Sequence, residues 1–166
     1  MKIWILRDYS RCVGCRICEI ECSRRHEAII WPSASRIRIH ESVFGFPIPY
    51  LCVQCDDYPC IPSCPTSALS VGETGAVVVD EERCVLCGSC IEACPGRVPR
   101  IVEGLKAVVI CDLCGGSPAC VEVCELMGFN ALRVGRKPEG EVVKNYLNNP
   151  LRASEEVARK LGVALR

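Results

Sequence analysis

Residues 84–95 read C-V-L-C-G-S-C-I-E-A-C-P, and this stretch decides the fold. Its four cysteines have the spacing C-x2-C-x2-C-x3-C, and a proline follows the last of them. The chain has 166 residues and sixteen cysteines, and all sixteen fall into four such groups. The groups are Cys12, Cys15, Cys18 and Cys22; Cys52, Cys55, Cys60 and Cys64; Cys84, Cys87, Cys90 and Cys94; and Cys111, Cys114, Cys120 and Cys124. The first and third groups share one spacing, whereas the second and fourth have a wider middle gap.

This spacing predicts 4Fe–4S clusters, because three thiolates on one tight loop reach three corners of a cube. Zinc sites also use C-x2-C pairs, but they set two pairs roughly a dozen or more residues apart around one metal. The zinc alternative is strongest for the fourth group, where the middle gap is loosest and Glu125 replaces the proline. A disulfide framework predicts irregular spacings and export, so it fits less well. We therefore expect four 4Fe–4S clusters as the cofactors and all sixteen cysteines as metal ligands.

The fourth cysteine of each run is expected to bind a neighbouring cluster, as it does in two-cluster ferredoxins. Pairing the second group with the third and the first with the fourth then gives four ligand sets. These are Cys52, Cys55, Cys60 and Cys94; Cys84, Cys87, Cys90 and Cys64; Cys12, Cys15, Cys18 and Cys124; and Cys111, Cys114, Cys120 and Cys22. The rival arrangement pairs the first group with the second and the third with the fourth. A single predicted hairpin joins the second group to the third, and this disfavours the rival.

The pattern between the groups predicts an α+β fold of two fused bacterial-type dicluster ferredoxin modules, with short hairpins and short helices around four clusters. Residues 2–9 and 36–40 are typical of strands, and residues 66–80 of a strand–turn–strand hairpin. Residues 44–49 contain one glycine and two prolines, which predicts a bend. Residues 105–110 are expected to form a strand before the fourth group.

We expect a four-cluster ferredoxin-like domain at 1–135 and a C-terminal tail at 136–166. Within the domain, an inner module spans about 50–104, and an outer module is built from 1–49 and 105–135. In the tail, Asn149 as cap and Pro150 at the first helical position predict a helix through Leu165. Its apolar face either packs on its own domain or docks a partner subunit or a second copy, so self-association is one possibility.

The formal net charge is zero, but four clusters with their thiolates would bring the loaded protein to roughly −8. Five arginines crowd the first group, either compensating cluster charge or forming a basic docking face; they are Arg7, Arg11, Arg16, Arg24 and Arg25. There is no long basic run with interleaved aromatic residues, so nucleic-acid binding is not expected.

The other polar residues give no sign of substrate chemistry. His26 and His40 are expected to have packing or surface roles, and Asp56, Asp57 and Asp112 to cap the cysteine loops. No catalytic triad, phosphate loop or paired carboxylate site is present, so the chain is expected to be non-catalytic.

The expected location is the cytoplasm of an anaerobic cell. The amino terminus has no apolar stretch of signal-peptide length, and no run approaches the length of a membrane helix, so direct membrane insertion is not expected. Export on a partner that carries the signal is the alternative.

The order of spacings resembles the four-cluster electron-transfer subunits of molybdenum and tungsten oxidoreductases, from about Cys12 to Val134. These include subunits of formate dehydrogenase, dimethyl sulfoxide or polysulfide reductase, hydrogenases and carbon monoxide dehydrogenase. Residues 12–27 (CVGCRICEIECSRRHE) and 111–124 (CDLCGGSPACVEVC) are similar to the small subunit of tungsten aldehyde oxidoreductase. After Cys124 the family pattern C-P-x-x-A-L is replaced by C-E-L-M-G-F-N-A-L, with three extra residues.

The resemblance implies an electron relay from a large tungsten or molybdenum pterin subunit to a soluble ferredoxin or a flavin/NAD partner. The first alternative keeps the relay but changes the partner to a formate, hydrogen or carbon monoxide enzyme. The second is a free-standing polyferredoxin that shuttles electrons without an obligate subunit.

Overall fold

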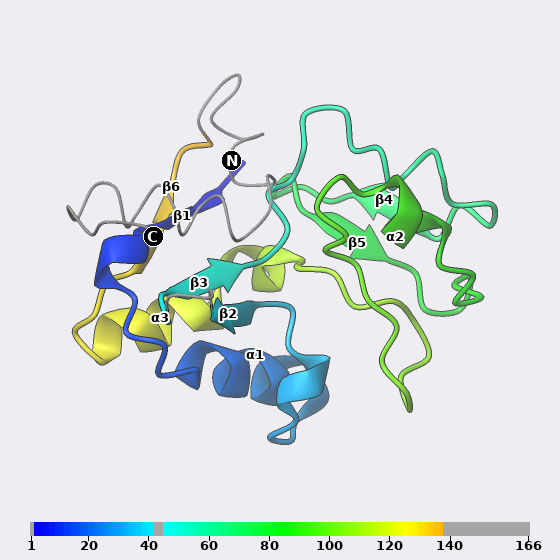
Figure 1. Cartoon of the computed structure of the whole chain (residues 1–166). Helices are drawn as coiled ribbons and strands as arrows, with labels where there is room; N and C mark the ends of the chain where they lie inside the picture. The colour runs from blue at the N-terminus through cyan, green and yellow to red at the C-terminus, as the bar shows by residue number, and fades with distance from the viewer. Residues whose placement is uncertain (1, 42–44, 138–166) are drawn as a thin grey trace.

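The computed structural model describes residues 2–41 and 45–137, which form short strands and helices linked by long loops (Figure 1). The elements are β1 (Trp4–Arg7), α1 (Ile17–Glu27), β2 (Arg38–Glu41), β3 (Pro47–Tyr50), β4 (Leu69–Val71), β5 (Val77–Val79), α2 (Ser89–Ala93), α3 (Ala119–Leu126) and β6 (Leu132–Gly135). Three 3-10 turns, at Tyr9–Arg11, Pro32–Ala34 and Leu113–Gly116, complete the set. The predicted α+β class is confirmed.

The strands pair into three antiparallel two-stranded sheets, β1 with β6, β2 with β3 and β4 with β5. In Figure 1, β4, β5 and α2 lie in the right half, and the other labelled elements lie in the left half. Trp4 is opposite Gly135, so segments near both ends of the described chain meet in one sheet. This arrangement agrees with an outer module built from both ends, and the division into modules stays a proposal.

The prediction of a bend over residues 44–49 holds at Gly45 but was wrong for residues 47–49, which lie in a strand. Pro47 and Pro49 belong to β3, where they stand opposite Glu41 and Ile39. The two prolines alternate along the strand, so both missing N–H groups fall on the same edge. A two-stranded sheet tolerates proline there because that edge forms no ladder.

The expected strand at 105–110 is reduced to a single bridge. Arg100 and Val109 exchange backbone hydrogen bonds of 3.1 and 2.8 Å, and no longer ladder forms around them. The predicted hairpin at 66–80 is confirmed as β4 and β5. The strands predicted within 2–9 and 36–40 are confirmed as β1 and β2.

The residue after the fourth cysteine of a group decides whether a helix continues. In the third group α2 ends at Ala93, and Cys94 caps it directly before Pro95. Cys22 and Cys124 have no proline after them, and both lie inside their helices, α1 and α3. Proline would remove an N–H and clash with the preceding turn. Its absence allows α1 and α3 to extend and to pack on each other.

The buried core is assembled around the cysteines. One cluster of buried side chains joins residues from near both ends, such as Ile5, Leu113 and Leu132, with Cys18 and Cys120. A second cluster joins β4, β5 and the 108–110 segment around Cys60 and Cys90. Trp4 is fully buried, and its Nε1 donates to the Val53 carbonyl at 2.9 Å, which ties β1 to the second cysteine group.

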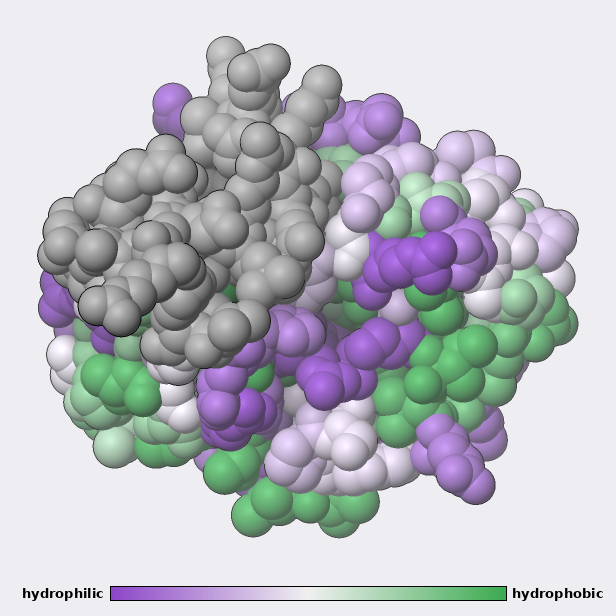
Figure 2. All heavy atoms as spheres, in the orientation of Figure 1, coloured by the Kyte–Doolittle hydropathy of each residue, from purple (hydrophilic) through white to green (hydrophobic). Residues whose placement is uncertain are grey.

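The surface in Figure 2 mixes hydrophilic and hydrophobic residues, with a larger hydrophobic stretch on the right-hand half. No helix among residues 2–41 and 45–137 is long and apolar enough to cross a membrane. The helix predicted after Asn149 lies outside the described residues.

Candidate metal centres

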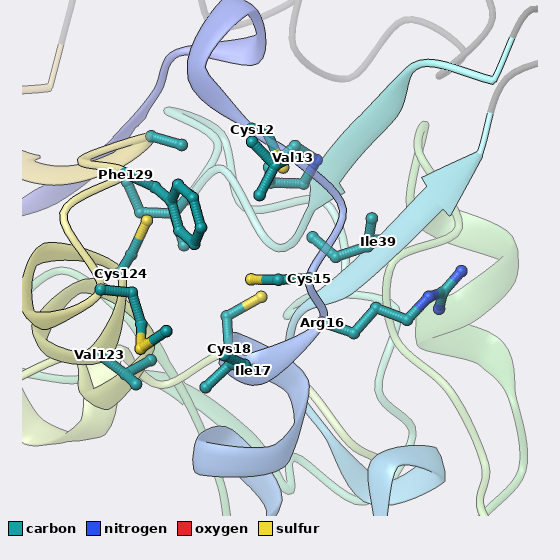
Figure 3. A pocket seen from close by; sticks show the side chains of 14 residues that line it. Cys12, Val13, Cys15, Arg16, Ile17, Cys18, Ile39, Val123, Cys124 and Phe129 are labelled. Carbon is teal, nitrogen blue, oxygen red and sulfur yellow. The ribbon is translucent and has the colours of Figure 1, made fainter.

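One cavity brings together Cys12, Cys15, Cys18 and Cys124 (Figure 3). Cys12 and Cys15 lie in the loop before α1, and Cys18 lies in the first turn of α1. Cys124 comes from α3, across the cavity. The sulfurs of Cys15 and Cys18 point into the cavity, between apolar side chains. The side chains labelled around them include Val13, Ile39, Val123 and Phe129.

A second cavity is lined by Cys52, Cys55, Cys60 and Cys94. The lining brings three cysteines of the second group together with the fourth cysteine of the third group. This is the set expected from cross-pairing, and Val77, Val98 and Ile110 make the cavity wall apolar.

The remaining cysteines are also neighbours in the expected sets. Burial raises the pKa of Cys90, and the charges of Cys84, Cys87 and Cys64 raise it further; Cys64 and Cys84 also pack against the buried cluster that contains Cys90. Burial, followed by the charges of Cys111, Cys22, Cys18 and Cys114, raises the pKa of Cys120, and Cys22, Cys111 and Cys120 lie in one buried cluster with Cys18. Two predicted quartets thus each line one cavity, and the cysteines of the other two lie close enough to act on one another electrostatically; ligation by all four stays a prediction.

The first C-x-x-C turn of every group shares one backbone feature. The residue before the second cysteine lies in the left-handed region in each group: Gly14 (φ 71°), Gln54 (φ 47°), Leu86 (φ 56°) and Leu113 (φ 57°). A residue with a side chain pays about 1–2 kcal/mol for this conformation. Strain of this kind persists where the surroundings fix it, and it gathers at functional sites.

Backbone amides donate to the sulfur of the fourth cysteine in three groups. The Ala68 N–H lies 3.3 Å from Cys64 Sγ, and the Val98 N–H lies 3.4 Å from Cys94 Sγ, each four residues further on. The Arg36 N–H reaches Cys22 Sγ at 3.1 Å. Hydrogen bonds to sulfur stabilise thiolates and tune the potential of clusters bound by them.

The donor set fits iron–sulfur clusters. Burial raises the pKa of Cys52 to about 12 and that of Cys60 to about 11, and it raises the pKa values of Cys111 and Cys120 well above the usual thiol range. Four such thiols cannot all ionise in one apolar cavity without a positive centre. A bound metal deprotonates its thiol ligands outright. Quartets of thiolates in a cavity therefore match the four-cysteine ligand set of a 4Fe–4S cluster.

His26 has a larger role than the sequence indicated. Its Nδ1 lies 2.8 Å from the Cys22 carbonyl, and its Nε2 lies 3.0 Å from Asp112 Oδ1. Asp112 also accepts from the Cys114 N–H at 2.9 Å, as expected of a loop cap. Hydrogen bonds with Asp112, Cys114 and Cys22 raise the pKa of His26 to about 12. His26 therefore connects α1 to the fourth cysteine loop, and its position one helical turn after Cys22 was the available signal.

Several arginines near the first group are paired with carboxylates. Arg16 lies 3.0 Å from Glu41 and 3.4 Å from Glu19, and Arg24 lies 2.7 Å from Glu21. These pairs favour local charge compensation over a free basic docking face at Arg16 and Arg24.

Comparison with known proteins supports the cysteine chemistry. A family model described as a 4Fe-4S dicluster domain matches residues 43–134. This chain is a member of that family. A polyferredoxin-like subunit of aliphatic sulfonate oxidoreductase from Pyrococcus furiosus is 53% identical over 96% of this chain and 93% of the relative.

More distant relatives of this dicluster-domain protein are also oxidoreductase subunits. The B subunit of anaerobic dimethyl sulfoxide reductase from Escherichia coli is 33% identical, over 81% of this chain and 76% of the relative. The thiosulfate reductase electron transfer subunit PhsB of Salmonella typhi is 32% identical, over 83% and 78%. A solved chain of the BamBC complex of benzoyl coenzyme A reductase with benzoyl-CoA aligns with a TM-score of 0.45 at 21% identity, covering 97% of this chain and 90% of that chain.

The prediction of an iron–sulfur electron-transfer protein without its own catalytic centre is thereby confirmed. Such relatives transfer electrons within oxidoreductases, and the family model names the cofactor type. The number of clusters and the catalytic partner belong to the proposal below.

Proposed function

We propose that this dicluster-domain protein binds four 4Fe–4S clusters and relays electrons between a catalytic subunit and a soluble acceptor. The observation that carries the proposal is that neighbouring quartets share buried clusters: Cys18, Cys111 and Cys120 lie in one, with Cys52 packed against it, and Cys60 and Cys90 lie in another. Cys18 raises the pKa of Cys120, Cys52 that of Cys111, and Cys90 that of Cys60, each secondary to burial. Each effect joins one quartet to the next.

These contacts order the sites along the molecule. The quartet with Cys12 adjoins the one with Cys111, which adjoins the one with Cys52, which adjoins the one with Cys84. Among the cysteines of the described chain, only Cys15 and Cys87 are exposed, and they belong to the first and last quartets of this series. We infer that electrons enter and leave at these two ends.

The protein's own residues would hold, insulate and tune the carriers. Each bound cluster supplies a one-electron carrier. Buried cysteines such as Cys111 and Cys120 exclude water from the middle of the series. Amides of Arg36, Ala68 and Val98 donate to thiolate sulfurs and thereby set their charge density.

We propose a tungsten or molybdenum pterin subunit as the catalytic partner and a ferredoxin or a flavin/NAD subunit as the other partner, in the cytoplasm. Two substrate classes are candidates. Aliphatic sulfonate oxidation is favoured by the relative that is 53% identical over nearly the whole chain. Aldehyde oxidation is favoured by the resemblance of the first and fourth cysteine groups to the tungsten aldehyde enzymes.

Anaerobic isolation of the tagged chain from its native cells tests this assignment. The expected result is a stoichiometric large subunit that contains tungsten or molybdenum and reduces a viologen dye with an aliphatic sulfonate or an aldehyde. Substrates of the two classes, supplied separately, decide between them. A chain that elutes alone with its iron and full redox activity would overturn the partner proposal and favour a free shuttle.

A further inference from the structure

A cationic cleft lies between the β2–β3 hairpin and the segment 96–100, next to the cavity of the Cys52 quartet, with which it shares Val98. Its volume is about 310 Å³, and the side chains that give it its character are Arg36, Arg38, His40, Tyr50, Arg97 and Arg100. Among the described residues, neither aspartate nor glutamate lines it. Four guanidinium groups and an imidazole around one hollow are an unusual concentration of positive charge.

Two of the four arginines are neutralised from outside the cleft. Arg36 is paired with Glu27. Arg97 donates to both carboxylate oxygens of Glu92, at 3.0 and 2.8 Å. These two pairs account for no more than half of the arginine charge around the cleft.

Arg100 keeps its charge inside the protein. Its guanidinium donates to the carbonyls of Ser33, at 3.0 Å, and Ser35, and these neutral groups fix its position without compensating its charge. Arg38 is exposed on β2 and lines the same cleft. A fixed, half-buried guanidinium and an exposed one therefore share the hollow.

The pKa values of Arg100 and His40 are lowered first by burial and then by the positive charges around them. Burial, followed by the charges of Arg38 and Arg36, lowers the pKa of Arg100 to about 10, with Glu19 opposing. Burial, followed by Arg38, lowers the pKa of His40, with Glu19 again opposing. An anion in the cleft would offset these positive charges.

We propose that the cleft binds a small oxyanion of the phosphate class, held by Arg38 and Arg100. Guanidinium groups match tetrahedral oxyanions by donating two parallel hydrogen bonds. The volume corresponds to about ten water molecules at roughly 30 Å³ each, which leaves room for an oxyanion and its remaining waters or for a small organic phosphate. The rings of Tyr50 and His40, edge to face at 5.1 Å, form an aromatic wall beside it.

A competing explanation is that these arginines only offset the charge of a nearby cluster. The Arg36 N–H donates to Cys22 Sγ, and the charge of Cys22 acts on Arg100. Under that explanation no anion would bind, because the thiolates would already satisfy the guanidinium groups. Binding measurements therefore separate the two explanations without reference to the relay.

The test is anaerobic titration calorimetry of the protein as isolated, with inorganic phosphate and, separately, AMP, at an ionic strength fixed by potassium chloride. Saturable binding of at least one is expected. Arg38→Gln should weaken it at least tenfold, because one charge-assisted contact is lost. Arg133→Gln is the matched control, since Arg133 is an exposed strand arginine on β6 away from the cleft. It should bind like the wild type.

Comparing the two ligands identifies the occupant. A site for an organic phosphate should bind AMP more tightly than inorganic phosphate, whereas a site for the free ion should not. Absence of binding to both in the wild type would overturn the proposal. Equal weakening by Arg38→Gln and Arg133→Gln would also overturn it, since that result means non-specific charge screening.

Discussion

Replacing Cys94 by alanine should remove the cluster that we assign to the second cysteine group, not the one assigned to the third. Cys94 belongs to the third group by sequence, but it lines the same cavity as Cys52, Cys55 and Cys60. Its sulfur accepts the Val98 N–H at 3.4 Å in that position. The cavity therefore loses one of its four sulfur ligands, and the neighbouring quartet loses none.

The magnitude follows from the ligand sets. Four cubes hold about 16 iron atoms per chain, so loss of one leaves about 12. Cys52→Ala alone should also leave about 12. The double variant Cys52→Ala/Cys94→Ala should again leave about 12, because both substitutions act on one cluster. The double variant Cys90→Ala/Cys94→Ala should leave about 8, because it removes ligands from two clusters.

Anaerobic iron and acid-labile sulfide analysis of the purified variants measures these values, with low-temperature EPR of the reduced protein as a second readout. Sites that share a cluster are strongly non-additive, whereas independent sites add. The reverse outcome, about 8 for Cys52/Cys94 and about 12 for Cys90/Cys94, would mean that each sequence group holds its own cluster. That result would refute cross-pairing.

Three further substitutions test the framework around the sites. Trp4→Phe should destabilise the holoprotein by about 1–3 kcal/mol in chemical denaturation, because it leaves the buried Val53 carbonyl without its donor, whereas Trp31→Phe serves as the tryptophan control. Ser23→Pro should cost about 3 kcal/mol or more of stability and reduce the helical circular dichroism signal, because it interrupts α1; an unchanged spectrum would contradict the role we give to the missing proline. Folding lowers the pKa of His40, so as the pH falls through the usual histidine pKa of about 6.5 the unfolded protein takes up a proton before the folded one does. The free energy of unfolding should therefore fall from pH 7 to pH 5 more steeply in the wild type than in His40→Gln. Equal slopes for the two proteins would argue against this.

Much of the site could be predicted from sequence because cysteine spacing constrains geometry. Three cysteines on one tight loop must lie together, and the hairpin over 69–79 brings the second group next to the third. The hairpin itself followed from two short segments, 66–71 and 76–80, on either side of a turn from Gly72 to Gly75. These are local signals, and tertiary contacts did not override them.

Other features depended on contacts that the sequence does not display. Gln54, Leu86 and Leu113 have no preference for left-handed backbone, so the shared turn was visible only at Gly14. The strand containing Pro47 was missed because its prolines fall on the unpaired edge, which only the register reveals.

The His26 contact was missed for a similar reason. Its partner Asp112 is 86 residues away in the chain, and the pairing depends on the packing of α1 against the fourth cysteine loop. Pattern and composition describe neighbours along the chain, whereas this contact is set by the tertiary fold.

The central claim is that the cysteine quartets hold four iron–sulfur clusters. Metal and sulfide analysis of the wild-type protein, purified without oxygen, tests it most directly. The account predicts about 16 iron and about 16 acid-labile sulfide per chain. About 4 zinc per chain with no sulfide would contradict it.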